Sequence, residues 1–413
     1  MAPGAPALRG FAAHNKLALA ALAVLFLVSC KEQVAIEPPG DAPVFTVRFD
    51  KSLSEQAQDG RLLLMLSSHD EKEPRFLVGV SADSQLIFGR NVEGWKPGEA
   101  VAVDQSAIGF PLADLSQLPA GDYYAQALLN RYKDFHLANG KVVSLPPDRG
   151  EGQQWNRKPG NFYSKPVKLS ISAQGPQSFS LVLDQVIPDI VPPEDTEFVK
   201  HVRMRSEMLS EFWGEDVYLG AHVLLPKGFE EHPEARYPLM IFHGHFPDDF
   251  GGFRTEPPDP GLEPDFSARF GVHGYNIIQQ QEAYDFYQKW VSDDFPRFIV
   301  IEIQHPTPYY DDSYAVNSAS QGPYGDALTY ELIPFIEEKF RGIGEGWSRF
   351  TYGGSTGGWE AMAVQVFYPD EYNGAFIACP DPIDFRAYMT INIYEDRNAY
   401  WYDSEYRKIP RPA

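Results

Sequence analysis

The sequence predicts two folded domains, an all-β sandwich over residues 43–186 followed by an α/β domain over residues 196–413. Residues 43–186 contain many short β-prone runs separated by Gly, Pro, Asn and Asp, with little helical periodicity, which is typical of an antiparallel sandwich. After residue 195, β-prone runs alternate with longer helical segments, which indicates a mostly parallel sheet covered by helices. Proline-containing stretches within 30–42 and 187–195 are therefore predicted to be linkers.

The expected sandwich rests on six β-prone runs with turn residues between them. Their apolar and β-branched residues alternate or form short blocks, as in strands with at least one buried face. The runs lie at residues 44–49, 62–66, 76–80, 123–129, 167–171 and 179–183. Acids, histidines and nucleophilic side chains do not cluster in this part of the sequence. We therefore expect a spacer or a carbohydrate-facing module without chemistry of its own.

The expected α/β domain rests on five β-prone runs and three helical ones. The strands are predicted at 217–225, 237–242, 298–304, 349–352 and 375–379, and the helices at 277–291, 327–340 and 359–368. In the second of these helices, apolar residues recur at helical spacing and form one stripe. Pro334 lies inside that helix and should kink it, because proline has no backbone N–H to donate.

The first 29 residues have the pattern of a secretory signal peptide. Basic side chains precede an unbroken apolar run at 17–28, which is shorter than the roughly 20 residues needed to span a bilayer. Residues 27–30, Leu-Val-Ser-Cys, resemble a bacterial lipobox. We expect Cys30 to carry lipid after cleavage and to anchor the exported protein to a membrane of the cell envelope, facing the periplasm or the outer membrane. The alternative is an uncleaved apolar anchor with an incidental cysteine.

Composition argues against two classes of protein. With 413 residues and 43% apolar side chains, the chain can bury large cores, which argues against general disorder. The formal charge of −22, from 57 acidic and 35 basic residues, argues against a nucleic-acid partner, because phosphate backbones require concentrated Lys and Arg. Once Cys30 carries lipid, Cys379 is the one thiol left, so no internal disulfide is expected. Cys379 itself is predicted to be a small buried core residue.

Residues 353–358, Gly-Gly-Ser-Thr-Gly-Gly, contain a G-x-S-x-G element between a predicted strand and a predicted helix. A nucleophile elbow requires this context. The serine of such an elbow occupies a strained turn above the sheet, and side chains at Gly353 and Gly357 would collide with the neighbouring strand and helix. We therefore predict Ser355 as a catalytic nucleophile.

Donors for an oxyanion are predicted at two places. The backbone N–H of Thr356 lies at the expected helix start, where the helix dipole favours negative charge. After the strand at 237–242 comes His243-Gly244-His245, and we expect Gly244 and His245 to lie beside the elbow. An alternative for this loop is a metal site formed by His243, His245, Asp248 and Asp249. No third histidine with suitable spacing supports it, so neither a metal nor another cofactor is predicted.

From roughly residue 218 to residue 379, the sequence resembles the group of α/β-hydrolases that contains esterase D, feruloyl esterases and enterochelin esterases. The matching stretches are 237–238 with 243–244, 324–328 with 331–337, 352–358, and 368–370 with 375–379. This resemblance covers under half of the chain. It implies an α/β-hydrolase fold and a serine ester hydrolase, with Ser355 as the nucleophile and Gly244, His245 and Thr356 near the oxyanion.

The sequence departs from this group where the catalytic base should be. In the α/β-hydrolase fold the order is Ser, then Asp or Glu, then His, yet all ten histidines precede Ser355 and the last is His305. Only 34 residues follow Cys379, about the length of one strand–helix–strand unit. We therefore expect a C-terminally truncated form of a longer enzyme. His305 and His245 are the alternatives for the base; Asp381 and Asp384 could face the substrate, act as the acid or cap the next segment.

These observations together predict a lipid-anchored serine esterase that forms an acyl-enzyme with a small-molecule or glycan-linked ester. Acyl transfer to an alcohol would use the same residues and stays open. The alternative from another class is a non-catalytic surface lipoprotein that retains the elbow as scaffold and binds a glycan or a protein through its sandwich. Tyr309, Tyr310 and Tyr314 are candidates for the wall of a substrate pocket, although aromatic side chains more often pack in cores.

Overall fold

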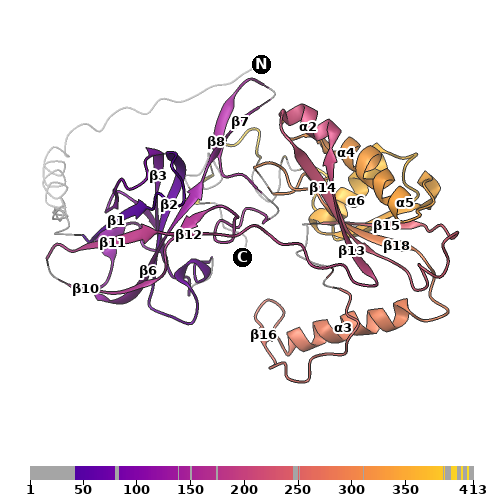
Figure 1. Cartoon of the computed structure of the whole chain (residues 1–413), viewed down its shortest axis with the longest axis horizontal. Coiled ribbons are helices and arrows are strands. Elements are labelled where there is room, and N and C mark those ends of the chain that lie inside the picture. Colours follow the sequence, from indigo (N-terminus) through magenta and orange to yellow (C-terminus); the bar gives the residue numbers. More distant parts are fainter. Residues whose placement is uncertain are drawn as a thin grey trace, which may run out of the picture.

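The structure is a computed structural model of the chain, and its described residues form a β-rich lobe and a mixed α/β lobe (Figure 1). The predicted signal peptide, Cys30, Tyr310 and three residues of the predicted oxyanion loop, His245, Asp248 and Asp249, lie outside the described residues. The described residues are 42–79, 83–137, 139–148, 151–173, 175–244, 250, 252–309, 311–384, 386, 392–397, 401–402 and 407–408.

The β-rich lobe contains two sheets packed face to face. The smaller sheet has the order β11-β1-β4, and the larger has the order β12-β9-β6-β2-β3-β5, with β10 also paired to β6. The hairpin β7–β8 is separate from both sheets and projects toward the α/β lobe (Figure 1). The elements are β1 (Val44–Phe49), β2 (Gln58–Ser67), η1 (Pro74–Phe76), β3 (Leu86–Trp95), β4 (Val101–Val103), β5 (Ile108–Phe110), η2 (Leu115–Gln117), β6 (Gly121–Arg131), β7 (Lys133–His136), β8 (Val142–Leu145), β9 (Phe162–Tyr163), β10 (Val167–Ile171), β11 (Ser178–Leu183) and β12 (Gln185–Val186).

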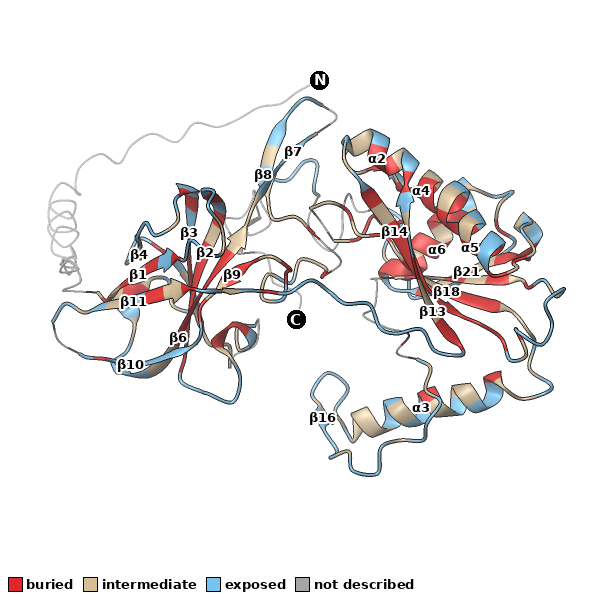
Figure 2. Cartoon of the chain, viewed as in Figure 1, coloured by how far each residue is buried: buried red, intermediate tan, exposed pale blue. Residues whose placement is uncertain are grey.

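Alternate side chains of both sheets form the core of this sandwich. Phe45, Val47 and Phe49 of β1 are fully buried against apolar side chains of β2 and β6, because successive strand residues point to opposite faces. The opposite face of β2 is buried as well, where Leu63 packs with Ile187. Ile187, the first residue of the predicted second linker, therefore belongs to the sandwich, while residues 188–195 are exposed and without regular structure (Figure 2).

Three details of the predicted sandwich are wrong. β1 and β11 pair in parallel, so the sandwich is not purely antiparallel. The strand predicted at 76–80 is not formed, because Pro74 begins the 3₁₀ turn η1; its fixed φ fits a helical first position. β3 was not predicted, since Gly, Arg and Asn interrupt its apolar pattern, yet it pairs with β2 along most of its length.

The α/β lobe contains a six-stranded mixed sheet in the order β13-β14-β18-β15-β21-β22. The last four strands in this order are parallel to one another, whereas β13 and β14 are antiparallel at one edge. The sheet is therefore parallel where it carries the predicted nucleophile. Its strands are β13 (Val199–Ser206), β14 (Val217–Leu224), β15 (Leu239–His243), β18 (Ile299–Gln304), β21 (Arg349–Gly354) and β22 (Ala375–Ala378).

Helices cover one face of this sheet. Ile299, Ile301 and Ile303 of β18 point toward that face and pack with the helical residues of 324–340. Val300 points to the opposite face, where Trp290 at the end of α3 contacts the sheet. The remaining elements are α2 (Glu207–Trp213), β16 (Phe266–Ser267), β17 (Val272–His273), α3 (Tyr275–Trp290), β19 (Asn317–Ser318), β20 (Gly322–Pro323), α4 (Tyr324–Ala327), η3 (Leu328–Leu332), α5 (Ile333–Lys339), η4 (Gly346–Ser348), α6 (Thr356–Phe367), β23 (Trp401–Tyr402) and β24 (Arg407–Lys408).

The predicted helix at 327–340 is interrupted next to Pro334. It runs from α4 into α5 through a π-helical turn, η3, which ends two residues before the proline. A proline ring clashes with the carbonyl four residues earlier and has no N–H, so a wider turn at this point relieves the clash. Within the described part of the chain, no helix combines the length and the apolar character needed to cross a membrane.

Candidate functional site

Ser355 occupies the sharp turn between β21 and α6. Its φ of 56° and ψ of −122° lie in a region that side-chain-bearing residues rarely adopt. The turn is fixed by its backbone: Ser355 N donates to Ala378 O at 3.0 Å, and Ser355 O accepts from Asp381 N at 3.2 Å. Ser355 is exposed, although Gly353 before it and Thr356 after it are buried. The elbow predicted from the sequence is therefore present and presents the serine to solvent.

Glycines let three backbone segments meet at this turn. A Cβ at Gly357 would lie 1.9 Å from His243 O, and one at Gly353 would lie 2.3 Å from Gly357 O. Contacts this short with backbone atoms exclude any side chain at either position. Gly354 differs, because a Cβ there would meet nothing closer than 3.8 Å. The two collisions predicted at Gly353 and Gly357 are confirmed.

The predicted oxyanion donors Thr356 and Gly244 lie at the elbow. Thr356 is the first residue of α6, so its backbone N–H is one of those that have no partner within the helix. Gly244 follows β15, which is paired with β21 up to His243 and Gly353, and its Cα is 2.9 Å from the position of a Cβ on Gly357. The third predicted donor, His245, lies outside the described residues.

Two further side chains join the site, Tyr314 and Asp381. Thr356 Oγ1 donates to Asp381 Oδ2 at 2.9 Å, and the Tyr314 hydroxyl is hydrogen-bonded to the Thr356 side chain. The Tyr314 ring packs edge-on against Trp359, with centroids 5.7 Å apart, and burial raises the pKa of the phenol. Asp384, by contrast, accepts from Arg386 N and caps a turn. From the sequence, Asp381 and Tyr314 were only candidates for the site, because their placement depends on loops that follow different strands.

Of the two histidines considered as substitutes for the base, His305 lies within the described structure and His245 lies outside it. His305 is fully buried; its Nδ1 is 2.8 Å from Ser313 Oγ and 3.3 Å from Ser313 N. Nε2 is 3.9 Å from Glu360 Oε2, and His243 Nδ1 is 3.6 Å from the same oxygen. Burial lowers the pKa of His243 to about 3. Neither imidazole is hydrogen-bonded to Ser355 in the described structure, and the described residues hold no cluster of metal ligands.

The structure corrects one further expectation and locates the tyrosines. Cys379 is exposed at the end of β22 and is not a core residue, because β22 is the edge strand of the described sheet. Tyr309 packs between Phe135 and Trp213 and does not face the elbow. Tyr310 lies outside the described residues. Tyr314 is therefore the one of the three tyrosines that the structure places beside Ser355.

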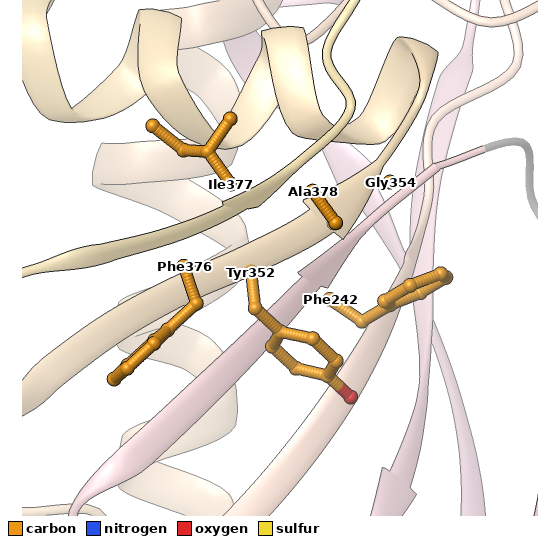
Figure 3. Close-up of a pocket in the computed structure, with 7 residues that line it drawn as sticks. Phe242, Tyr352, Gly354, Phe376, Ile377 and Ala378 are labelled. Atoms are coloured by element: carbon orange, nitrogen blue, oxygen red, sulfur yellow. The ribbon is translucent and has the colours of Figure 1, made fainter.

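A shallow hollow lies beside the elbow on the sheet surface, but Ser355 does not line it. The rings of Phe242, Tyr352 and Phe376 project from three adjacent strands to the same side, and Ile377 points to the other side (Figure 3). The Phe242 and Tyr352 rings are 5.2 Å apart. This apolar surface is thus distinct from the polar side of the elbow that carries Thr356 and Asp381.

A strained serine between a parallel strand and a helix, on a mixed sheet, is the arrangement of a nucleophile elbow. No protein-family model and no curated protein matches the sequence. The solved structures to which the chain is similar include a ferulic acid esterase, with 20% identity over 48% of this chain and 68% of that chain and a TM-score of 0.30. They also include an S-formylglutathione hydrolase from Agrobacterium tumefaciens, with 12% identity over 44% of this chain and 58% of that chain and a TM-score of 0.28. A fluorophosphonate-binding serine hydrolase of Staphylococcus aureus has 15% identity over 43% of this chain and 55% of that chain, with a TM-score of 0.25. The chain thus spans between about half and two thirds of their length.

Proposed function

We propose that the α/β lobe is a serine ester hydrolase in which Ser355 forms a covalent acyl-enzyme with a small-molecule or glycan-linked ester. The observation that carries this proposal is the exposed Ser355 at φ 56°, held between β21 and the first turn of α6. A strained backbone at a solvent-facing serine persists only where its surroundings over-determine it, and here the close packing at Gly353 and Gly357 and two backbone hydrogen bonds do so.

In the first chemical step, Ser355 Oγ attacks the acyl carbon and the negative charge moves to the carbonyl oxygen. The Thr356 N–H at the start of α6 and the backbone at Gly244 are the donors that would stabilise this charge. The bond from the acyl carbon to the alcohol oxygen then breaks, and the proton of Ser355 passes through a base to the departing alcohol. Water attacks the acyl-enzyme in the second step, which releases the acid and restores the serine hydroxyl.

Formation of the covalent adduct and turnover are separate measurements, and both require a base that takes the proton of Ser355. His243 and His305 are directed at buried Glu360 and are not suited to this role. Asp381 is hydrogen-bonded to the elbow: its backbone N–H donates to Ser355 O, and its carboxylate accepts from Thr356 Oγ1. A fluorophosphonate probe reports the nucleophile and its oxyanion donors directly, since it leaves phosphorus bonded to Oγ and releases fluoride.

The test is labelling of the full chain with a fluorophosphonate, followed by mass spectrometry of the labelled peptide. We expect one label on Ser355, none in Ser355→Ala, and unchanged labelling in Ser320→Ala, which removes an exposed serine of the same lobe. An unlabelled wild-type chain would refute the proposal and favour the alternative of a non-catalytic protein that retains the elbow as scaffold.

We further propose that the chain is exported and anchored through Cys30 to the cell envelope. The lipobox-like residues 27–30 and the preceding apolar run at 17–28 support this. Metabolic labelling with an alkyne fatty acid should mark the wild type and not Cys30→Ser, while Cys379→Ser should keep the label. Equal labelling of all three would contradict the anchor.

A further inference from the structure

The sandwich contacts the α/β lobe next to the Ser355 site. Phe135 of β7 is 3% exposed and packs against Tyr309 and Trp213, with ring centroids 4.9 and 6.3 Å away. Lys133 of the same strand forms an ion pair with Glu215. The hairpin β7–β8 therefore reaches out of the sandwich toward the other lobe (Figure 1), where Phe135 packs against Tyr309 and Trp213.

Polar contacts continue this interface beyond the hairpin. Asp148 N donates to Pro308 O at 2.9 Å, and the Gln153 side-chain amide donates to Tyr309 O at 2.8 Å. Gln153 is itself held in a left-handed conformation with φ 60°, and its backbone N–H donates to Asp148 Oδ2 at 3.0 Å. Two consecutive carbonyls of the α/β lobe thus accept hydrogen bonds from one folded segment of the sandwich.

Pro308 and Tyr309 belong to the segment that leads from β18 to the site. We call residues 305–309 and 311–315 the Tyr314 loop. Its other end carries Tyr314, with φ 55°, and Ala315, with φ 52°, two consecutive non-glycine residues in the left-handed region. Such a conformation persists only where surrounding contacts enforce it. On the site side, Tyr314 contacts Thr356 and Trp359, which follow Ser355 in the sequence.

We propose that the sandwich is a structural part of the Ser355 site: it holds the Tyr314 loop in its strained conformation, so that Tyr314 lies against Thr356 at the elbow. Phe135 and Gln153 are the positioning residues, and they act through the Tyr314 loop without touching Ser355 or a substrate. The sandwich is then not a spacer, because Phe135 and Gln153 act on the conformation of the Ser355 site. This role rests on the proposed function of Ser355.

The test compares Phe135→Ala and Gln153→Ala with two controls in the same sandwich. Phe179→Ala removes a ring that stacks on Phe45, 5.1 Å away, and Gln185→Ala removes a glutamine whose side chain bonds only its neighbour Asp184. The first readout is amide hydrogen exchange in peptides that cover 311–315. The second is the rate constant for fluorophosphonate labelling of Ser355.

We expect both interface variants to exchange faster at 311–315 and to label more slowly, by roughly fivefold for the single hydrogen bond lost in Gln153→Ala. Both controls should match the wild type in the two readouts. Unchanged exchange at 311–315, or faster exchange with an unchanged labelling rate, would overturn the proposal. If the wild type is not labelled at all, the proposed function fails, and the exchange measurement still decides whether the sandwich holds the loop.

Discussion

Gly357→Ala is the sharpest test of the elbow's packing. A Cβ at this position would lie 1.9 Å from His243 O, about 1.5 Å inside the 3.4 Å at which ordinary contact begins, and 2.9 Å from Gly244 Cα. Both atoms are backbone atoms, so no side chain can rotate away. Either α6 or the end of β15 has to move, and these two elements carry the donors at Thr356 and Gly244.

Overpacking a core costs about 1 to 3 kcal/mol, and a clash of this depth against backbone lies at the upper end, near 3 kcal/mol. Gly354→Ala is the matched control from the same turn, because its Cβ would meet nothing within 3.8 Å. The measurement is urea unfolding of both variants, followed by hydrogen exchange in α6 to assign the transition to the α/β lobe.

We expect the α/β transition of Gly357→Ala to shift to lower urea and Ser355 labelling to fall, while Gly354→Ala stays close to the wild type. Equal urea midpoints for Gly357→Ala and Gly354→Ala would refute the view that residue 357 is a glycine because of its close contact with neighbouring backbone and not because of backbone flexibility.

Two further predictions concern buried charge and pH. Arg349 is 5% exposed and bonds buried Glu337 through two nitrogens at 2.8 Å, so Arg349→Met should destabilise the α/β lobe by about 3 to 5 kcal/mol, because it leaves the carboxylate unpaired. Arg205→Met, which breaks the exposed pair with Asp216, should change little, and similar urea midpoints for both variants would contradict this. Burial lowers the pKa of His243 from 6.5 to about 3, so below pH 6.5 the unfolded chain binds a proton that the folded chain does not. Stability should therefore fall as the pH drops from 6.5 toward 3, by about 2 kcal/mol between pH 7 and pH 5. His243→Gln should remove this part of the pH dependence of stability, and the exposed control His69→Gln should retain it. The same pH dependence in both variants would count against a neutral buried His243.

The local pattern predicted most strands of the α/β sheet and missed features that depend on packing between segments. Strands such as β18 were found because their apolar runs are buried on both faces, which gives a continuous signal. β3 was missed because its interior Gly89 lies against the Arg61 side chain of β2, a contact that only the pairing creates. A kink was predicted at Pro334, because proline disrupts a helix wherever it occurs in the interior. The structure has a π turn just before this proline.

In the candidate site, too, the local motif could be predicted from the sequence and the side chains from other segments could not. Ser355, Thr356 and Gly357 are consecutive, so one short motif defines the nucleophile, the helix start and the close contact. Tyr314 and Asp381 come from loops after two other strands, and sequence spacing does not show that both meet at Thr356. The sequence also predicted His305 on the same sheet edge as the elbow, but it gave no sign that the ring turns inward to Glu360.

By itself the sequence determined the strand–turn–helix that presents Ser355, because steric limits on φ and ψ and the need for glycine act over a few neighbouring residues. Only the tertiary structure decided which side chains surround that serine and that Phe135, Asp148 and Gln153 of the sandwich reach the Tyr314 loop. Some of these contacts join residues more than 150 positions apart, as between Gln153 and Tyr309, and they depend on how complete sheets pack. No local pattern encodes them, since the free energy that selects them comes from burial and hydrogen bonds that exist only after both lobes have folded.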